Sequence, residues 1–199
     1  MARTAGSNGD KTRAAITEAA LELIARHGFE AMSMRRLAAR VGVQAAAVYR
    51  YFPTKEDLLY ALMRAHMEGL ITSWEAARTR APADPARQLA AFVDNHIRFH
   101  VTRRLSTQVS NMELRSLSPE RLTHILRLRN AYEKELRQIL REGVEAGRFR
   151  IDDTALTAMA IVQMITGVVV WFRPGERLSV EQVTDTYHTM TQRLVGAEA

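Results

Sequence analysis

The chain has 199 residues, of which 47% are hydrophobic, and it contains no cysteine. This length allows one or two domains with a substantial core, and the lack of cysteine excludes disulfides and thiolate metal sites. A formal net charge of +6 favours a polyanionic partner such as nucleic acid. The first ten residues, MARTAGSNGD, have no apolar core of a signal peptide, so residues 1–9 are expected to form a disordered arm of a cytoplasmic protein.

The first helix is predicted over residues 10–27. Ile16, Ala20 and Leu23 recur at helical spacing and form a stripe that must pack on neighbouring helices. Gly28 is expected to end the helix, because glycine readily adopts the positive φ of a C-cap.

Two short helices joined by a tight turn are predicted next. Ser33 is a candidate N-cap for the first, and Gly42 supplies the positive φ that ends it. The second helix spans about residues 44–51 and points Val48 inward. Such a pair has the layout of a helix-turn-helix, whose second helix enters the major groove of DNA.

The charge of this stretch also indicates DNA. Between residues 31 and 55 there is no Asp or Glu, whereas five cations occur, namely Arg35, Arg36, Arg40, Arg50 and Lys55. Phosphates bind well beside cations and helix N-termini. A solvated basic face is the alternative interpretation, and DNA binding is the favoured one.

Residues 11–63 resemble the N-terminal domain of the TetR family of bacterial transcriptional regulators. The resemblance rests on the Ala-Leu-Glu-Leu-Ile run, His27-Gly28-Phe29, Val41-Gly42-Val43, Tyr49-Arg50-Tyr51-Phe52 and Lys55-Glu56-Asp57-Leu58-Leu59. It implies a dimer on a palindromic operator. The implied DNA-binding residues are Ser33, Arg35, Arg36, Gln44, Ala45, Ala46, Tyr49, Arg50, Tyr51, Thr54 and Lys55.

Within that set, Arg36, Gln44 and Arg50 are assigned to base edges. The sequence departs from many family members at Ala45-Ala46-Ala47, which can offer only methyl contacts, for example to thymine. Ser33, Tyr49, Tyr51, Thr54 and Lys55 are assigned to phosphates, as the matching family positions imply.

A long helix is predicted over residues 54–80, opened by a capping box of Thr54 and Asp57. The expected organisation is a helix-turn-helix domain at 10–53 and a helical effector-binding and dimerisation domain at 54–199. Further helices are predicted at 84–104, 106–117, 119–146, 152–172 and 179–195, from the Pro, Gly, Ser and Asp residues at their ends. The fold class is all-α, with about nine helices.

The segment 154–172 is apolar on nearly every side. A membrane span is the alternative, but Thr157, Gln163, Thr166 and Gly167 interrupt the segment and no second span accompanies it. The expectation is a buried helix that packs on its own domain on one side and on a second subunit on the other. The resemblance implies a homodimer through the last two helices, and no membrane partner is expected.

Polar residues on apolar stripes indicate a pocket for a small-molecule effector, although each is also compatible with a hydrogen-bonded core group. Adaptable apolar walls would come from Met and Trp side chains. The candidate effector residues are His66, Trp74, Phe92, His96, His100, Met112, Arg129, Tyr132, Met159 and Gln163.

Enzyme and metal chemistry are not favoured. His96 and His100 have the i, i+4 spacing of metal ligands, but no cysteine or further motif joins them. Phosphate-binding glycine loops and nucleophile motifs are absent from the sequence. No cofactor, catalytic residue or metal ligand is therefore assigned.

One late motif bears on the effector. Residues 171–175, Trp-Phe-Arg-Pro-Gly, followed by Leu178-Ser179, resemble a TetR subgroup that responds to acyl-CoA thioesters. An acyl-CoA is therefore preferred to an aromatic or drug-like inducer of an efflux system, with Arg98, Arg103, Arg104 or Arg129 as candidates for the CoA phosphates. An effector-independent DNA-binding factor and an enzyme that uses the His pair remain alternatives.

Overall fold

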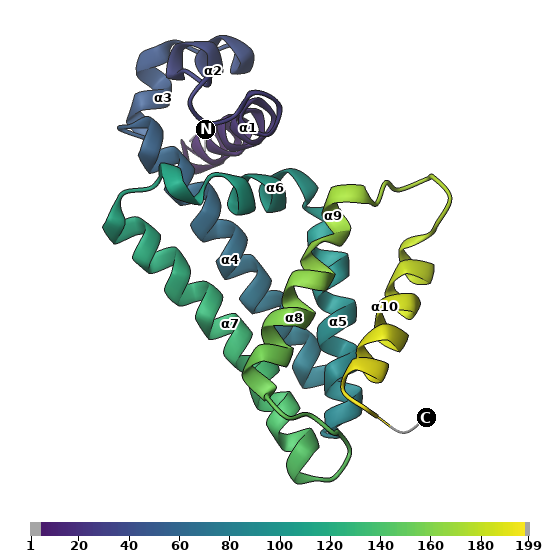
Figure 1. The fold of residues 1–199 in the computed structure, drawn as a ribbon. Coiled ribbons are helices and arrows are strands. Elements are labelled where there is room, and N and C mark those ends of the chain that lie inside the picture. Colours follow the sequence, from purple (N-terminus) through teal and green to yellow (C-terminus); the bar gives the residue numbers. More distant parts are fainter. Residues whose placement is uncertain (1–4, 198–199) are drawn as a thin grey trace. The chain divides into compact units, whose positions relative to one another are not determined.

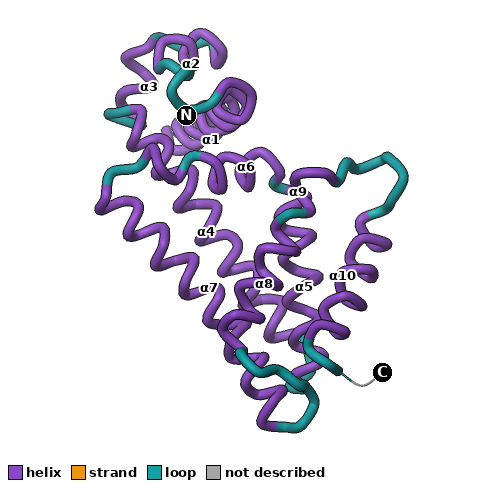
Figure 2. The backbone as a smooth tube through the Cα atoms, viewed as in Figure 1, coloured by secondary structure: helices purple, strands orange, loops and turns teal. Residues whose placement is uncertain are grey.

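The structure, a computed structural model, describes residues 5–197. Over this range the elements are helices joined by turns (Figures 1 and 2), so the prediction of an all-α fold is confirmed. The elements are α1 (Ala5–His27), α2 (Met34–Val41), α3 (Ala45–Tyr51), α4 (Lys55–Arg80), α5 (Pro85–Thr102), α6 (Arg104–Met112), the 3-10 turn η1 (Leu114–Ser116), α7 (Pro119–Glu145), α8 (Thr154–Thr166), α9 (Val168–Trp171) and α10 (Val180–Leu194).

Two compact units make up the chain. Unit 1 comprises Met1–His66 and Leu105–Ile125, and unit 2 comprises Met67–Arg104 and Leu126–Ala199. Helices α4 and α7 each supply residues to both units. The division differs from the predicted domain boundary after residue 53, because α6 and the first turns of α4 and α7 pack with α1–α3. The domain boundary after residue 53 therefore stays a prediction.

The core of unit 1 is built from the apolar stripes that the sequence predicts. Ile16 and Ala20 of α1, Leu37 of α2 and Val48 of α3 are fully buried, as is Leu58 of α4. Burial of such side chains contributes about 1.5–3 kcal/mol each relative to an exposed position. This core fixes the orientation of α2 and α3 within unit 1.

The first helix begins earlier than predicted. Residues 5–9 are helical, which corrects the expectation of a disordered arm for that part, while residues 1–4 lie outside the described residues. Two glycines make this stretch a poor helix former by propensity. At Gly9 an added Cβ would lie 3.7 Å from the hydroxyl of Tyr51, an ordinary contact distance, so α1 and the end of α3 are neighbours here.

The helix predicted at 84–104 ends early, and the helix at 106–117 is shorter than predicted. The hydroxyl of Thr102 donates to the carbonyls of Arg98 and Phe99, which takes up acceptors of the last turn. Such side-chain bonds compete with continued helix. Arg103 then leaves helical geometry with ψ of 40°, and α6 starts at Arg104 and gives way after Met112 to one 3-10 turn.

Helices α8 and α9 form one interrupted helix, because Gly167 between them keeps helical angles of −59° and −19°. Counting them as one gives the predicted nine α-helices in the described residues. Ala158, Ile161 and Ile165 are buried, whereas Leu156 and Val170 are exposed. The expectation that one side packs on its own domain is confirmed.

By length and composition the Thr154–Trp171 stretch is apolar enough to cross a membrane, with a mean hydropathy of 1.8. It is the one such candidate among the described residues. Core helices of soluble proteins pass the same test, so a single candidate is weak support for a span.

Candidate DNA-binding and effector sites

Local sequence signals position the helix-turn-helix. Ser33 is the N-cap of α2, and its hydroxyl accepts the backbone N–H of Arg36 at 3.2 Å. Gly42 ends α2 with φ of 74°, and its N–H donates to carbonyls of the last turn. Both caps were predicted and are confirmed. They orient α3 with Val48 in the core and the opposite face outward.

The outward face of α3 carries the residues assigned to DNA. Gln44 is the N-cap residue but makes no side-chain capping bond, so its amide is available to a base edge. Gln44, Ala46, Tyr49 and Arg50 are exposed, and Ala45 and Tyr51 are half-buried, so the structure brings these predicted residues onto one short helix.

Several predicted DNA-binding cations have internal partners. The guanidinium of Arg36 lies 3.2 Å from the His27 ring, and Arg40 pairs with Glu22 at 2.7 Å. Arg35 and Arg50 are exposed and make no ion pair with any described residue. Exposed pairs contribute about 0–1 kcal/mol, so Arg36 and Arg40 can exchange their partners for phosphates at little cost.

Lys55 at the start of α4 is held by the loop after α1. Its ammonium donates to the carbonyl of Glu30 at 3.1 Å and lies 4.2 Å from the centre of the Phe29 ring. The predicted capping box is present, since Asp57 accepts from the Thr54 N–H at 2.9 Å and donates its own N–H to the Thr54 hydroxyl at 3.0 Å. The N-terminal turn of α4 is thus rigid before any DNA binds.

The sequence did not indicate how the start of α7 fastens the start of α4 in unit 1. The guanidinium of Arg121 contacts both Asp57 and Glu56, and the Ser118 N–H donates to Glu56 at 2.8 Å. The bond from Ser118 holds the pKa of Glu56 below its usual value, and the Thr54 hydroxyl does the same for Asp57. In the sequence, the available signal for this contact was a basic side chain shortly after Ser118-Pro119.

Helix α6 anchors the end of α1 within unit 1. The Gln108 amide donates to the Ala25 carbonyl at 3.2 Å, and Glu113 accepts the Phe29 N–H at 3.1 Å. His66 of α4 lies within hydrogen-bond distance of the Ser106 hydroxyl at 3.1 Å. Apart from His66 and Phe29, these contacts involve residues that no sequence motif singled out.

Unit 2 contains a buried polar cluster formed by α5, α7 and α8. The two ring nitrogens of His96 lie 3.1 Å from the Tyr132 hydroxyl and 2.9 Å from the Thr166 hydroxyl. The His100 ring stacks on His96 with centroids 3.9 Å apart. Phe92 stacks on Tyr132 and meets the edge of Trp74. Five of the predicted effector residues therefore come together: Trp74, Phe92, His96, His100 and Tyr132.

Burial controls the charge of this cluster. It lowers the pKa of His100 from 6.5 to about 4, so the imidazole is neutral at pH 7. It also lowers the pKa of Arg129, whose Nε is buried, and raises the pKa of Tyr132 well above its usual value. The positive charge of Arg129 also lowers the pKa of His100, so a neutral imidazole lies near the half-buried guanidinium.

A cleft of about 220 Å³ opens beside this cluster in unit 2, between α4 and α7. Ile71, Trp74 and Tyr132 form its apolar wall. The Trp74 indole N–H donates to Glu135 at 3.4 Å, and Arg78 pairs with the same carboxylate at 3.0 Å. Glu135 and Arg78 were not identified from the sequence, because charged residues are common on the solvated faces of helices.

Three predicted effector residues lie away from the cluster. Met159 and Gln163 are exposed on α8, and Met112 is 63% exposed at the end of α6 in unit 1, where it lines a small hollow against α1. In the single chain these three side chains are exposed and outside the cluster, and their role in effector binding stays a prediction. The rotation of a helix about its own axis decides which of its residues are exposed. A one-sided apolar stripe fixes this rotation, whereas a sequence that is apolar on all sides does not.

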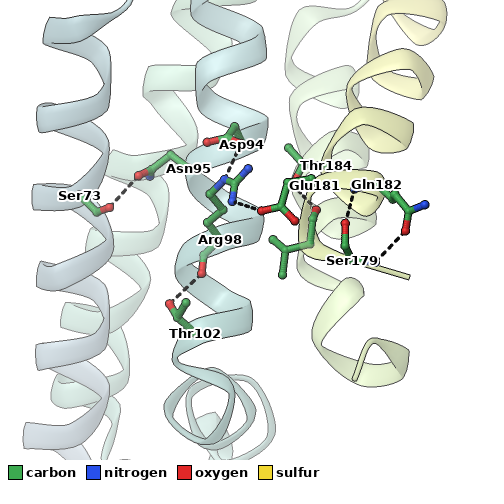
Figure 3. Close-up of polar contacts among 10 residues, drawn as sticks. Ser73, Asp94, Asn95, Arg98, Thr102, Ser179, Glu181, Gln182 and Thr184 are labelled. Carbon is green, nitrogen blue, oxygen red and sulfur yellow. Dashed lines mark hydrogen bonds and ion pairs between the residues drawn. The ribbon is translucent and has the colours of Figure 1, made fainter. Parts of the chain in front are cut away.

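The arginines proposed for CoA phosphates are partly engaged elsewhere. Arg98 pairs with Asp94 at 2.7 Å and with Glu181 of α10 at 3.1 Å, an arrangement visible in Figure 3. Asp94 in particular raises the pKa of Arg98. Arg103 lies 4.3 Å from the centre of the Phe99 ring, and Arg104 donates to the Phe172 carbonyl. Arg98 is thus a structural tie between α5 and α10.

Metal binding at the His pair finds no support in the side-chain contacts. His100 is bonded through Nδ1 to the His96 carbonyl at 2.7 Å, while both His96 nitrogens face hydroxyls. The described residues contain no group of three His, Asp or Glu side chains that could hold a metal ion.

Comparison with known proteins agrees with this architecture. Residues 16–62 match the model of the bacterial regulatory proteins of the tetR family, and residues 82–195 match that of the tetracyclin repressor-like C-terminal domain. The chain is 28% identical over 154 residues to the fatty acid metabolism regulator protein of Bacillus subtilis, covering 77% of each chain. It is 25% identical to the transcriptional repressor KstR2 of Mycobacterium tuberculosis, covering 94% of each.

A solved structure is also similar. The crystal structure of AibR in complex with isovaleryl coenzyme A and operator DNA matches with a TM-score of 0.79 at 27% identity, covering 94% of this chain and 99% of AibR. The second family model alone covers more than half of the 199 residues. Together with the helix-turn-helix geometry of α2 and α3, these matches place the chain in the TetR family of bacterial transcriptional regulators.

Proposed function

We propose that this protein is a non-catalytic repressor that binds a palindromic operator as a homodimer and is released by an acyl-CoA thioester. Regulators of the family bind operator DNA as dimers. The names of two relatives support the effector, since one regulates fatty acid metabolism and AibR was crystallised with isovaleryl coenzyme A. The proposed effector is an acyl-CoA thioester for this reason.

The observation that carries the proposal is the aromatic and histidine cluster of unit 2, with Arg129 near it. Arg129 with its buried Nε stands near a neutral His100. Trp74, Phe92 and Tyr132 provide an aromatic wall beside it. An acyl chain would pack on the aromatic wall, and the thioester carbonyl or a CoA phosphate would accept from Arg129.

Helix α4 is the proposed route from effector to DNA. Trp74 belongs to the same helix that Thr54 and Lys55 begin. A ligand can bias that helix only if it binds one orientation better than the other. A 100-fold loss of operator affinity requires about 2.7 kcal/mol of differential binding, within the usual range of allosteric couplings.

A second effector class follows from the cleft between α4 and α7. Glu75 lines it together with Trp74 and Tyr132, while the second carboxylate, Glu135, is paired with Arg78. Aromatic faces beside carboxylates favour a cationic or drug-like compound. Such an effector would make the protein a repressor of an efflux system, and it would bind without a requirement for Arg129.

Calorimetry with isovaleryl-, octanoyl- and palmitoyl-CoA, with and without operator, tests the proposal. Thioesters should bind, the free acids should bind poorly, and operator should weaken thioester affinity by the same factor as thioester weakens operator affinity. Arg129→Ala should lower thioester affinity while ligand-free DNA binding stays close to wild type. Arg127→Ala, an exposed arginine on the same helix, is the matched control and should change neither.

The outcomes separate the candidate functions. Equal thioester affinity for free and operator-bound protein would rule out release by ligand and leave an effector-independent DNA-binding factor. Failure of all thioesters to bind, together with binding of a cationic aromatic compound that is unaffected by Arg129→Ala, would establish the efflux alternative.

A further inference from the structure

A second, basic hollow of about 410 Å³ lies in unit 2 and shares no lining residue with the His96 cluster. It is formed by the first turns of α5, the loop after α7 and the last turn of α10. Small residues open the space, namely Ala86, Ala90, Gly147 and Gly196. Its polar lining consists of Arg87, Arg148, Arg150, His188 and Gln192.

Fixed backbone contacts build this hollow. Helices α5 and α10 run antiparallel, because Arg98 meets Glu181 at one end, whereas Ala90 and Gln192 line the hollow at the other. Arg150 donates its backbone N–H to the Val195 carbonyl at 2.8 Å, which ties the loop after α7 to the end of α10. Gly196 has φ of 62° and a Cβ there would lie 3.1 Å from the Cβ of Arg150, so only glycine fits without strain.

The charge of the hollow is one-sided. Among residues 5–197 its lining has three arginines and no carboxylate, and Arg148 makes a long ion-pair contact of 3.9 Å with Asp84. Within the described residues Arg87 forms no ion pair, and the side chains of His188 and Gln192 form no hydrogen bond. Arg87, His188 and Gln192 therefore present donors whose capacity the described part of the chain does not use.

Interaction of the arginines with helix dipoles explains only part of this arrangement. Arg148 and Arg150 follow the C-terminus of α7, where a cation interacts favourably with the helix dipole. Arg87 stands in the first turn of α5, where a cation opposes the dipole by a few tenths of a kcal/mol. An anion bound among the three arginines would remove this conflict.

We propose that this hollow is a second small-molecule site, which binds a phosphorylated metabolite of nucleotide size. Phosphoryl oxygens accept bidentate bonds from guanidinium groups, and the planar fork of arginine matches their geometry. The volume lies in the usual range for ligand pockets, about 300–1,000 Å³. His188 and Gln192 supply further donors, and the small residues leave room for the remainder of the ligand.

Calorimetry with ADP and with inorganic pyrophosphate on the full chain tests the site, with equimolar sulfate as competitor. Both probes should bind, and sulfate should displace them poorly. The double variant Arg87→Ala/Arg148→Ala should weaken both by at least about tenfold, because alanine cannot donate the charge-assisted hydrogen bonds of the two guanidinium groups. Arg193→Ala removes an exposed arginine of α10 outside the lining and should leave the affinity within about twofold.

A pair of substitutions at Ala90 tests the charge separately from the fold. Ala90→Glu places a carboxylate in the hollow, and Ala90→Gln places a neutral group of the same shape there. The glutamate variant should weaken pyrophosphate binding much more than the glutamine variant, and thermal unfolding checks that both variants are folded. Equal effects of the two variants, unchanged affinity of the double arginine variant, or displacement by equimolar sulfate would each overturn the proposal, as would a lack of binding at millimolar probe.

This site is independent of the proposed effector site. Arg129→Ala should leave ADP and pyrophosphate binding unchanged, while Arg87→Ala/Arg148→Ala should leave operator binding without ligand unchanged. Loss of acyl-CoA binding in the first variant and loss of pyrophosphate binding in the second therefore report on the two sites separately.

Discussion

The carboxylate of Glu113, directly after α6, accepts the backbone N–H of Phe29, directly after the Gly28 C-cap of α1, at 3.1 Å. Phe29 is buried, and its ring supports the ammonium of Lys55 at 4.2 Å. These two contacts together join α6, the end of α1 and the start of α4 within unit 1. Through this arrangement α6 stabilises the frame that carries the helix-turn-helix.

Glu113→Ala should lower the free energy of unfolding by about 1–3 kcal/mol, because it leaves a part-buried N–H without its charged acceptor. Glu113→Gln retains an acceptor oxygen of the same reach and should restore most of the loss. Chemical denaturation gives the free energies, and amide exchange at Phe29 gives the local effect. Wild-type protection of the Phe29 amide in the alanine variant would disprove the anchoring role.

Gln44→Ala should relax base preference at one position per half-site by about 1–3 kcal/mol. Gln44 is exposed at the start of α3, and its amide can make paired bonds to an adenine edge. The measurement is binding across a library of operator variants. Discrimination equal to wild type at every position would remove Gln44 from base readout.

Lys55→Ala should weaken binding to operator and random DNA alike and reduce the salt slope by about one per subunit. The free protein holds the ammonium on the Glu30 carbonyl and over Phe29, so the lysine is oriented before DNA arrives. Arg80→Ala, an exposed cation at the far end of the same helix, is the control and should keep the wild-type slope. An unchanged slope for Lys55→Ala would show that this lysine has only the structural contacts seen here.

Val170→Glu should dissociate the homodimer proposed for α8–α10. Val170 is 73% exposed and Met190 and Leu194 about half exposed, an unusual apolar face for a single subunit. A carboxylate buried there without a partner is costly. Sedimentation of the variant should give a monomer with weaker operator binding, whereas Gln138→Glu on the exposed side of α7 should stay dimeric. A dimeric Val170→Glu protein would place the interface elsewhere.

His100 should make the protein less stable as the pH falls from 7.5 to 5.5. Its pKa is about 4 in the folded chain and 6.5 ordinarily, so in this window the unfolded chain binds more protons and stability rises with pH. The two values give a loss of about 1.3 kcal/mol at pH 5.5 relative to pH 7.5.

His100→Asn keeps a donor for the His96 carbonyl and should flatten this pH dependence, as measured by urea unfolding at both pH values. His188→Gln removes a histidine of α10 outside the cluster and should keep the wild-type difference. The same slope in His100→Asn as in wild type would assign the effect to other groups.

Local signals in the sequence determined the helix-turn-helix. Ser33, Gly42 and the Thr54–Asp57 capping box act within a few residues of chain, so the geometry that they impose needs no distant partner. The apolar stripe of Ile16, Ala20 and Leu23 likewise has one buried side by its spacing alone. These features carried both the fold class and the family resemblance.

Only the tertiary structure decided the partners of charged and polar side chains. Arg98 was a candidate for phosphate, but Glu181, distant in sequence, holds it against α10 (Figure 3). The exposed positions of Met159 and Gln163 depend on the rotation of an apolar helix that has no polar side to fix it. The basic hollow is lined by residues from several segments between positions 86 and 197, so no local sequence pattern marks it. Such sites arise from long-range packing, which no short pattern encodes.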